Sequence, residues 1–155
     1  RDLYYSEFNT IIKNSDFEFK IRSRRPPKDR INALISFGNS ALYTTVLGEI
    51  YNTYLDPRIG FLHATNARRF SLNLDIADIF KPVMVDRVIF TLLNKSIITK
   101  KDFVIQEVNN KLAAVIKHPK LNMNVSYKRL IRLELYKLQK HIMNDELYEG
   151  FVAKW

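Results

Sequence analysis

Apolar residues recur along most of the chain at intervals of three and four, the spacing of one buried helix face. The longest such stretch begins at Asp29, a residue type that caps helix N-termini, and is predicted to reach about Tyr54. Gly38 lies inside this helix and is expected to allow a close helix contact. The predicted buried stripe comprises Ile31, Leu34, Ile35, Leu42, Val46, Ile50 and Tyr54.

Two more helices follow from the same periodicity. One covers residues 1–12 with no capping residue ahead of it, so we expect the domain to begin inside a helix. The other should be capped by Ser71 and run to about Asn94. Pro82 has no N–H for the carbonyl of Asp78, which predicts a kink or a loosened turn there.

The remaining segments divide into a connector, an ambiguous stretch and a last helix. Asn14–Lys28 is predicted to be a polar, basic connector. Residues 103–116 suit a small β-hairpin around Asn109-Asn110, but Ala113-Ala114 suits a helix equally well. Tyr127–Met143 is predicted to be an amphipathic helix, with Leu130, Ile131, Leu135, Leu138 and Ile142 on its buried face. We therefore predict an all-α fold, a multi-helix bundle in one domain. Whether residues 103–116 form a small β-hairpin or a helix is not decided by the sequence.

Composition adds a prediction about partners. The formal net charge is +9 and the sequence pI is near 9.8, which favours a polyanionic partner, either nucleic acid or an acidic membrane surface. No apolar stretch is long enough to span a bilayer, so no membrane insertion is expected. Cysteine is absent, which excludes disulfides and thiolate metal sites and suits a cytoplasmic protein.

The candidate chemistry lies at His63, Asp75 and Asp78. The two aspartates are three residues apart on the predicted helix, so their carboxylates should share one face and repel each other. The pKa of one of them should rise unless a cation lies between them. Carboxylates with an imidazole suit Mn²⁺ or Mg²⁺. Spacing alone leaves open the alternative of a solvated acidic face and an ordinary polar histidine.

Several short motifs occur in order around these residues and carry a resemblance to a known family. The motifs are Pro26-Pro27-Lys28-Asp29, Asn32-Ala33-Leu34, Ser36-Phe37-Gly38, Leu55-Asp56-Pro57, Ile59-Gly60-Phe61-Leu62-His63 and Ser71 to Asp78, continued by Phe80, Pro82 and Asp86-Arg87. Together they resemble the C-terminal helical domain of the CRISPR-associated integrases (the Cas-one family), the catalytic proteins of spacer acquisition.

The resemblance implies a metal-dependent DNA endonuclease and integrase that inserts spacer DNA into the repeat array by transesterification. His63 and Asp78 match metal ligands for Mn²⁺ or Mg²⁺, and Asp75 matches a neighbouring essential residue. It also implies an N-terminal β domain, the first part of helix 1 and a glutamate ligand upstream of Arg1, so that residues 1–155 alone are expected to be inactive. The implied partners are double-stranded DNA (spacer precursor and repeat), a second subunit in a homodimer and the smaller Cas-two protein.

Basic residues provide the candidate DNA contacts. The candidates are Arg24, Arg25, Lys28 and Arg30 in a basic run with Lys20 and Arg22, and Arg58, Arg68 and Arg69 on either side of His63. A flexible, solvated basic connector remains the alternative for Lys20 to Arg25. The basic face of the last helix, including Lys128, Arg129 and Arg132, is expected to be only solvated. Tyr43, Tyr51 and Tyr54 recur at helical spacing, which favours core packing over base stacking.

A non-catalytic helical DNA-binding module is the main rival interpretation. It would use the same basic residues but would not need His63 with two aspartates, so replacing His63 would change no activity. A helical hydrolase of the His-Asp dyad class would need adjacent His-Asp residues, and no such dipeptide occurs in the sequence.

Overall fold

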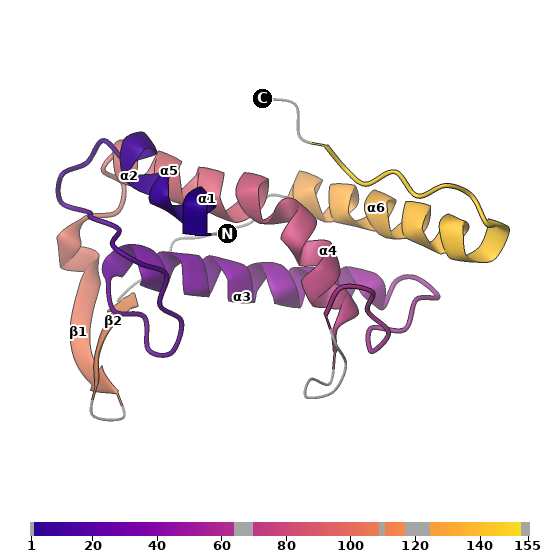
Figure 1. Cartoon of the computed structure of the whole chain (residues 1–155), viewed down its shortest axis with the longest axis horizontal. Coiled ribbons are helices and arrows are strands. Elements are labelled where there is room, and N and C mark those ends of the chain that lie inside the picture. The colour runs from indigo at the N-terminus through magenta and orange to yellow at the C-terminus, as the bar shows by residue number, and fades with distance from the viewer. Residues whose placement is uncertain (1, 64–69, 109–110, 117–124, 153–155) are drawn as a thin grey trace. The chain divides into compact units, whose positions relative to one another are not determined.

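A computed structural model describes residues 2–63, 70–108, 111–116 and 125–152 (Figure 1). Its helices are α1 (Asp2–Ser6), α2 (Phe8–Ile11), α3 (Arg30–Ile50), α4 (Leu72–Lys81), a π-helix (Pro82–Asp86), α5 (Arg87–Asn94), a 3₁₀ turn (Lys100–Asp102) and α6 (Val125–Asn144). The strands are β1 (Phe103–Val108) and β2 (Lys111–Ile116). The prediction of an all-α fold with one small hairpin is confirmed.

The hairpin resolves the alternative left open for residues 103–116. The two strands are antiparallel, with Phe103 opposite Ile116 and Val108 opposite Lys111. The turn predicted at Asn109-Asn110 lies outside the described residues. The chain folds as two compact units, one of residues 1–38 and 85–121 and the other of residues 39–84 and 122–155.

The first unit has an aromatic core that the sequence only partly predicts. Phe8 is 1% exposed, and its ring centroid lies 4.8 Å from that of Phe90 and 5.5 Å from that of Phe19. Phe17 and Phe19 are buried, so the predicted polar connector Asn14–Lys28 is anchored in the core. These two phenylalanines alternate with polar residues, a pattern too short to stand out by its periodicity.

The start of α3 is as predicted, but its end is not. The Asp29 carboxylate accepts the backbone N–H of Asn32 at 2.7 Å, which satisfies one donor of the first turn. The helix ends at Ile50, where the Thr53 hydroxyl donates to the Ile50 carbonyl at 2.7 Å. Such local hydrogen bonds compete with helix continuation. Tyr54 is 93% exposed, so its predicted place in the buried stripe is wrong.

Gly38 makes the predicted close contact. A Cβ atom built there would lie 2.6 Å from Cγ1 of Val85, which is buried and stiff about χ1. We expect Gly38→Ala to lower the free energy of unfolding by about 1–3 kcal/mol through overpacking. Gly48→Ala is the matched control, because a Cβ there meets nothing within 4 Å and alanine favours the helix. Urea denaturation measures both, and an unchanged midpoint for Gly38→Ala would contradict the contact.

Pro82 has the predicted effect on the helix that follows Ser71. The helical hydrogen-bond pattern changes at Pro82, where a π-helix of five residues separates α4 from α5. Proline cannot donate to the carbonyl four residues earlier, and a wider turn accommodates the missing bond. The π-helix therefore begins one turn after Asp78.

The second unit is built on apolar faces of α3, α4 and α6. Its fully buried side chains include Leu42, Val46, Ile50, Ile76, Phe80, Ile131 and Leu135. Ile142 is 65% exposed, so its predicted burial on the last helix is wrong. Buried Glu134 holds the segment after α6, since its Oε1 accepts both the Tyr148 hydroxyl and the Phe151 N–H at 2.8 Å. Among the described residues, every helix is too short or too polar to cross a membrane.

Candidate metal and nucleic-acid site

The loop that carries His63 is tied to the first turn of α4. The Pro57 carbonyl accepts the backbone N–H groups of Ser71 and Leu72, both at 3.1 Å. The Ser71 hydroxyl donates to the Arg58 carbonyl at 2.8 Å, so this predicted helix cap stabilises the loop and not the helix end. Gly60 lies so close that a Cβ there would be 2.7 Å from Oδ2 of Asp75. Only glycine fits at this position without displacing that carboxylate.

Asp75 anchors the loop through three consecutive backbone amides. Its Oδ2 accepts the N–H of Phe61 at 2.6 Å and that of Leu62 at 3.0 Å, while Oδ1 accepts the N–H of His63 at 3.0 Å. The Asp75 side chain is fully buried. Burial acts to raise the pKa of Asp75, but the hydrogen bonds from Leu62, His63 and Phe61 outweigh it and hold that pKa below its usual value.

The same carboxylate orients the imidazole of His63. Nδ1 of His63 lies 2.5 Å from Oδ1 of Asp75, and 36% of the His63 side chain is exposed. When Nδ1–H donates a hydrogen bond to the carboxylate, Nε2 carries the lone pair that can bind a metal ion. A carboxylate that holds one ring nitrogen is the usual partner of a metal-binding histidine. The side chains therefore suit a metal bound through Nε2.

Asp78 lies in a different environment from Asp75. Its side chain is 41% exposed and forms an ion pair with Lys81, one turn further along α4. For Asp75 the pKa is lowered and not raised, so repulsion from Asp78 does not dominate at that carboxylate. Backbone amides neutralise Asp75 inside the protein, and Lys81 neutralises Asp78 near the surface.

Lys81 is a site residue that the sequence reasoning missed. Its Nζ lies 4.8 Å from the centre of the Tyr43 ring, in addition to the ion pair with Asp78. Partial burial acts to lower the pKa of Lys81, but the hydrogen bond to Asp78 and the contact with Tyr43 raise it above its usual value. The three-residue spacing of Asp78 and Lys81 on a helix was the available signal.

The candidate metal ligands do not form a complete set in the described part of the chain. No group of three or more His, Asp or Glu side chains gathers there. His63 and Asp78 offer one imidazole and one exposed carboxylate, donors that suit Mn²⁺ or Mg²⁺. The four hydrogen bonds at Asp75 occupy its carboxylate, which suits a positioning role better than metal ligation.

The candidate DNA-contacting side chains differ in their exposure and in whether they already form an ion pair within the protein. Arg24, Arg25 and Lys28 are exposed, and Arg30 is half-buried at the first residue of α3. Arg58 forms a two-pronged pair with Asp56, at 3.0 Å from Nε and 2.6 Å from Nη2, which lowers the pKa of Asp56 to about 2. The predicted contacts Arg68 and Arg69 lie outside the described residues.

Arg22, from the same basic run, serves the fold. Its Nη1 donates to Oδ1 of Asn32 at 2.7 Å, and its Nη2 donates to the Ser36 hydroxyl at 3.2 Å. Asn32 is fully buried in α3. Arg22 thus fixes the connector to the helix, and a solvated chain is the wrong description of this position.

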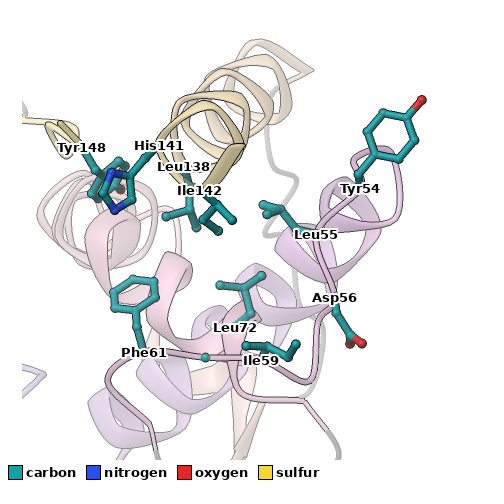
Figure 2. A pocket seen from close by; sticks show the side chains of 11 residues that line it. Tyr54, Leu55, Asp56, Ile59, Phe61, Leu72, Leu138, His141, Ile142 and Tyr148 are labelled. Atoms are coloured by element: carbon teal, nitrogen blue, oxygen red, sulfur yellow. The ribbon is translucent and has the colours of Figure 1, made fainter. Parts of the chain in front are cut away.

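An apolar pocket of about 570 Å³ lies beside the loop that precedes His63 (Figure 2). Phe61, Leu72 and Ile142 face its interior, whereas Tyr54 lies at its edge and points outward. Tyr51 is 64% exposed and Tyr54 is 93% exposed, so the core packing predicted for these tyrosines is wrong. Both follow the end of α3, where the helical spacing no longer applies.

The second unit therefore contains a half-exposed histidine held by a buried aspartate, and a surface aspartate paired with a lysine. This is a helical protein whose candidate site is built on the loop before α4 and on α4 itself. A family model described as CRISPR associated protein Cas1 matches residues 1–118. The chain belongs to that family, and the resemblance to the Cas-one family is confirmed.

Known relatives match the whole chain with part of their own length. The "CRISPR-associated endonuclease Cas1 2" of Thermodesulfovibrio yellowstonii is 53% identical over 171 residues, covering 100% of this chain and 52% of that protein. The structure of a CAS1 protein from Thermotoga maritima has a TM-score of 0.83 at 44% identity, covering 98% of this chain and 51% of that one. The chain thus spans about half the length of these relatives.

Two more distant solved structures share the fold. A casposase bound to integration product has a TM-score of 0.75 at 21% identity, covering 94% of this chain and 45% of that one. A partial Cas6-RT-Cas1–Cas2 complex has a TM-score of 0.82 at 19% identity, covering 98% of this chain and 50% of that one. At these identities the likeness shows the fold alone.

Proposed function

We propose that this chain is the catalytic half of a metal-dependent DNA endonuclease and integrase that inserts spacer DNA into a CRISPR array. The observation that carries the proposal is the imidazole of His63, held through Nδ1 by buried Asp75 at 2.5 Å. A DNA-binding module has no need of an imidazole fixed in this way. Membership of the Cas1 family and relatives named endonucleases support the same function.

Each site residue has a distinct role in the proposed reaction. His63 and Asp78 would hold Mn²⁺ or Mg²⁺, with Nε2 of His63 and the exposed carboxylate of Asp78 as donors. The bound cation would supply charge neutralisation at the phosphate and a lower pKa for the attacking hydroxyl. Asp75 keeps the His63 ring in the orientation and tautomer that leave Nε2 free. Lys81 balances the charge of Asp78 when no metal ion is bound to that carboxylate.

The reaction we infer is transesterification. The oxygen of a DNA 3′-hydroxyl attacks a repeat phosphodiester, and the 3′-oxygen of the cut strand leaves. Water in place of that hydroxyl gives simple cleavage. The substrate class is double-stranded DNA. We also infer a Cas2 partner and a homodimer, both of which the family resemblance implies.

A strand-transfer assay in Mn²⁺ tests this function. With the upstream half of the protein and the smaller partner supplied, a labelled short duplex should be joined to a plasmid that carries the repeat. The 155 residues alone should be nearly inert, because no group of three or more His, Asp or Glu side chains gathers in their described part. Robust cleavage by the isolated chain would contradict the incomplete ligand set, and the absence of joining in the full assembly would contradict the proposed function.

A further inference from the structure

A basic groove in the second unit has no role in the site described above. It consists of two adjoining hollows of about 440 and 580 Å³, between the outer faces of α3 and α6. Glu49 and Lys128 line both hollows, so the two meet at these side chains. Three cations from α6 line this groove, namely Lys128, Arg129 and Arg132, against the single carboxylate of Glu49.

Arg132 is fixed in place within the groove. Glu49 is 5% exposed, and its Oε2 accepts Nε of Arg132 at 2.7 Å. The Arg132 side chain remains 45% exposed, and its two terminal nitrogens donate to no other described residue. A guanidinium held by Nε presents its remaining donors in a rigid fork, the geometry that binds phosphate. The buried carboxylate thus prepares Arg132 for an anion.

The other cations and the floor of the groove suit the same ligand. Lys128 and Arg129 are exposed, and no carboxylate in the described chain lies within ion-pair distance of either. Lys128 lies one helical turn before Arg132, so both project from the same face of α6. On the α3 side of the groove, Gly48 has no side chain and leaves open space where a Cβ would be. A polyanionic strand can therefore approach α3 closely between the cations.

An aromatic and an aliphatic side chain complete the groove. Tyr136 is 41% exposed and Leu133 is 50% exposed, although both are large apolar residues. A cationic groove with an exposed aromatic ring is the arrangement that binds single-stranded nucleic acid, since every base can stack on such a ring. A groove for a free phosphate or an acidic peptide would not require the ring.

We propose that the groove between α3 and α6 binds a single DNA strand, with phosphates on Lys128, Arg129 and Arg132 and a base against Tyr136. The sequence suggested that this face of α6 is only solvated; Lys128 and Arg129 are exposed, whereas Arg132 is paired with buried Glu49. The choice of DNA as the polyanion rests on the proposed function. The groove itself does not depend on His63 or on a metal.

Fluorescence anisotropy of a labelled oligothymidylate, titrated with the 155-residue chain in EDTA over a range of salt, tests the groove. The double variant Lys128→Gln/Arg129→Gln should weaken binding about tenfold or more, because each charge-assisted contact is worth more than a neutral one. It should also reduce the slope of log K against log salt by about 1.4 for two lost phosphate contacts. Lys95→Gln/Lys101→Gln removes the same charge from exposed positions elsewhere and should leave the slope unchanged.

Two further variants separate the parts of the proposal. Glu49→Gln/Arg132→Gln removes the ion pair without leaving a buried charge unpaired, and it should weaken binding as the first variant does. Tyr136→Leu should weaken single-strand binding about tenfold, and Tyr136→Phe should restore it. If Lys128→Gln/Arg129→Gln and the control Lys95→Gln/Lys101→Gln weaken binding equally, the groove is not the binding site. An unaffected Tyr136→Leu variant, or tighter binding of a duplex of the same length, would overturn the single strand as its ligand. Because the assay contains no metal, failure of strand transfer leaves this result intact.

Discussion

Replacing His63 with alanine, or Asp78 with alanine, is expected to abolish strand transfer in Mn²⁺ while DNA binding persists. Each substitution removes one of two described donors that the proposed cation needs, and a bound cation stabilises a phosphoryl transition state by several kcal/mol. A loss of that size lowers the rate by about a thousandfold or more. Neither side chain is buried, since His63 and Asp78 are 36% and 41% exposed, so the fold should persist.

The assay compares strand transfer with DNA binding for each variant in the full-length assembly. His141→Ala is the matched control for His63, because it removes a partly exposed imidazole from a helix in the same unit. Glu149→Ala is the control for Asp78, because it removes an exposed carboxylate. Normal integration by either site variant would show that the site has been assigned to the wrong residues and would favour the rival DNA-binding module.

Asp75→Asn should lower both stability and activity, because this carboxylate accepts four hydrogen bonds. The asparagine amide replaces one acceptor oxygen with donors that face the backbone N–H groups of Phe61 and Leu62 or of His63. Leaving such buried groups unpaired should cost about 3 kcal/mol of unfolding free energy. Loss of the group that orients His63 should reduce strand transfer by about 10- to 100-fold.

The pH dependence of stability gives this prediction a second measurement. The pKa of Asp75 is lowered in the folded protein, so its stabilisation is present above the unfolded pKa of about 3.9. That stabilisation is lost as the pH falls through the folded pKa. The gap in urea midpoint between wild type and Asp75→Asn should therefore be full at pH 7 and shrink in acid.

A second buried aspartate separates lost stability from lost positioning. Asp86 is 4% exposed and accepts the Tyr4 hydroxyl at 2.7 Å, in the unit that does not contain His63. Asp86→Asn should destabilise the protein and leave strand transfer near normal at temperatures where it is folded. A wild-type urea midpoint for Asp75→Asn, or an equal loss of strand transfer in Asp86→Asn, would contradict the positioning role of Asp75.

Periodicity predicted the parts of the fold in which local and tertiary forces agree. Asp29 caps α3 as expected, and Pro82 disrupts the helix as its missing N–H requires. The end of α3 was not predictable from periodicity. Thr53 donates to the Ile50 carbonyl, and such side-chain bonds end a helix even where the apolar spacing continues to Tyr54.

The electrostatics of the candidate site residues could not be predicted from their spacing. The three-residue spacing of Asp75 and Asp78 suggested two carboxylates that repel each other. In the structure, the loop backbone turns three amides towards Asp75, and that conformation depends on the absence of a side chain at Gly60. No periodic pattern encodes such a turn. The spacing of Asp78 and Lys81 permits an ion pair, but it does not by itself distinguish a paired lysine from a solvated one.

The central claim is that Nε2 of His63 binds the metal of the proposed integrase. Pulsed electron paramagnetic resonance of Mn²⁺ bound to the full-length protein tests this directly, because an imidazole ligand gives a nitrogen coupling to the metal. We predict a nitrogen coupling in the wild type that disappears in His63→Gln and persists in His141→Gln. A spectrum without nitrogen coupling, or one that His63→Gln leaves unchanged, would contradict the account.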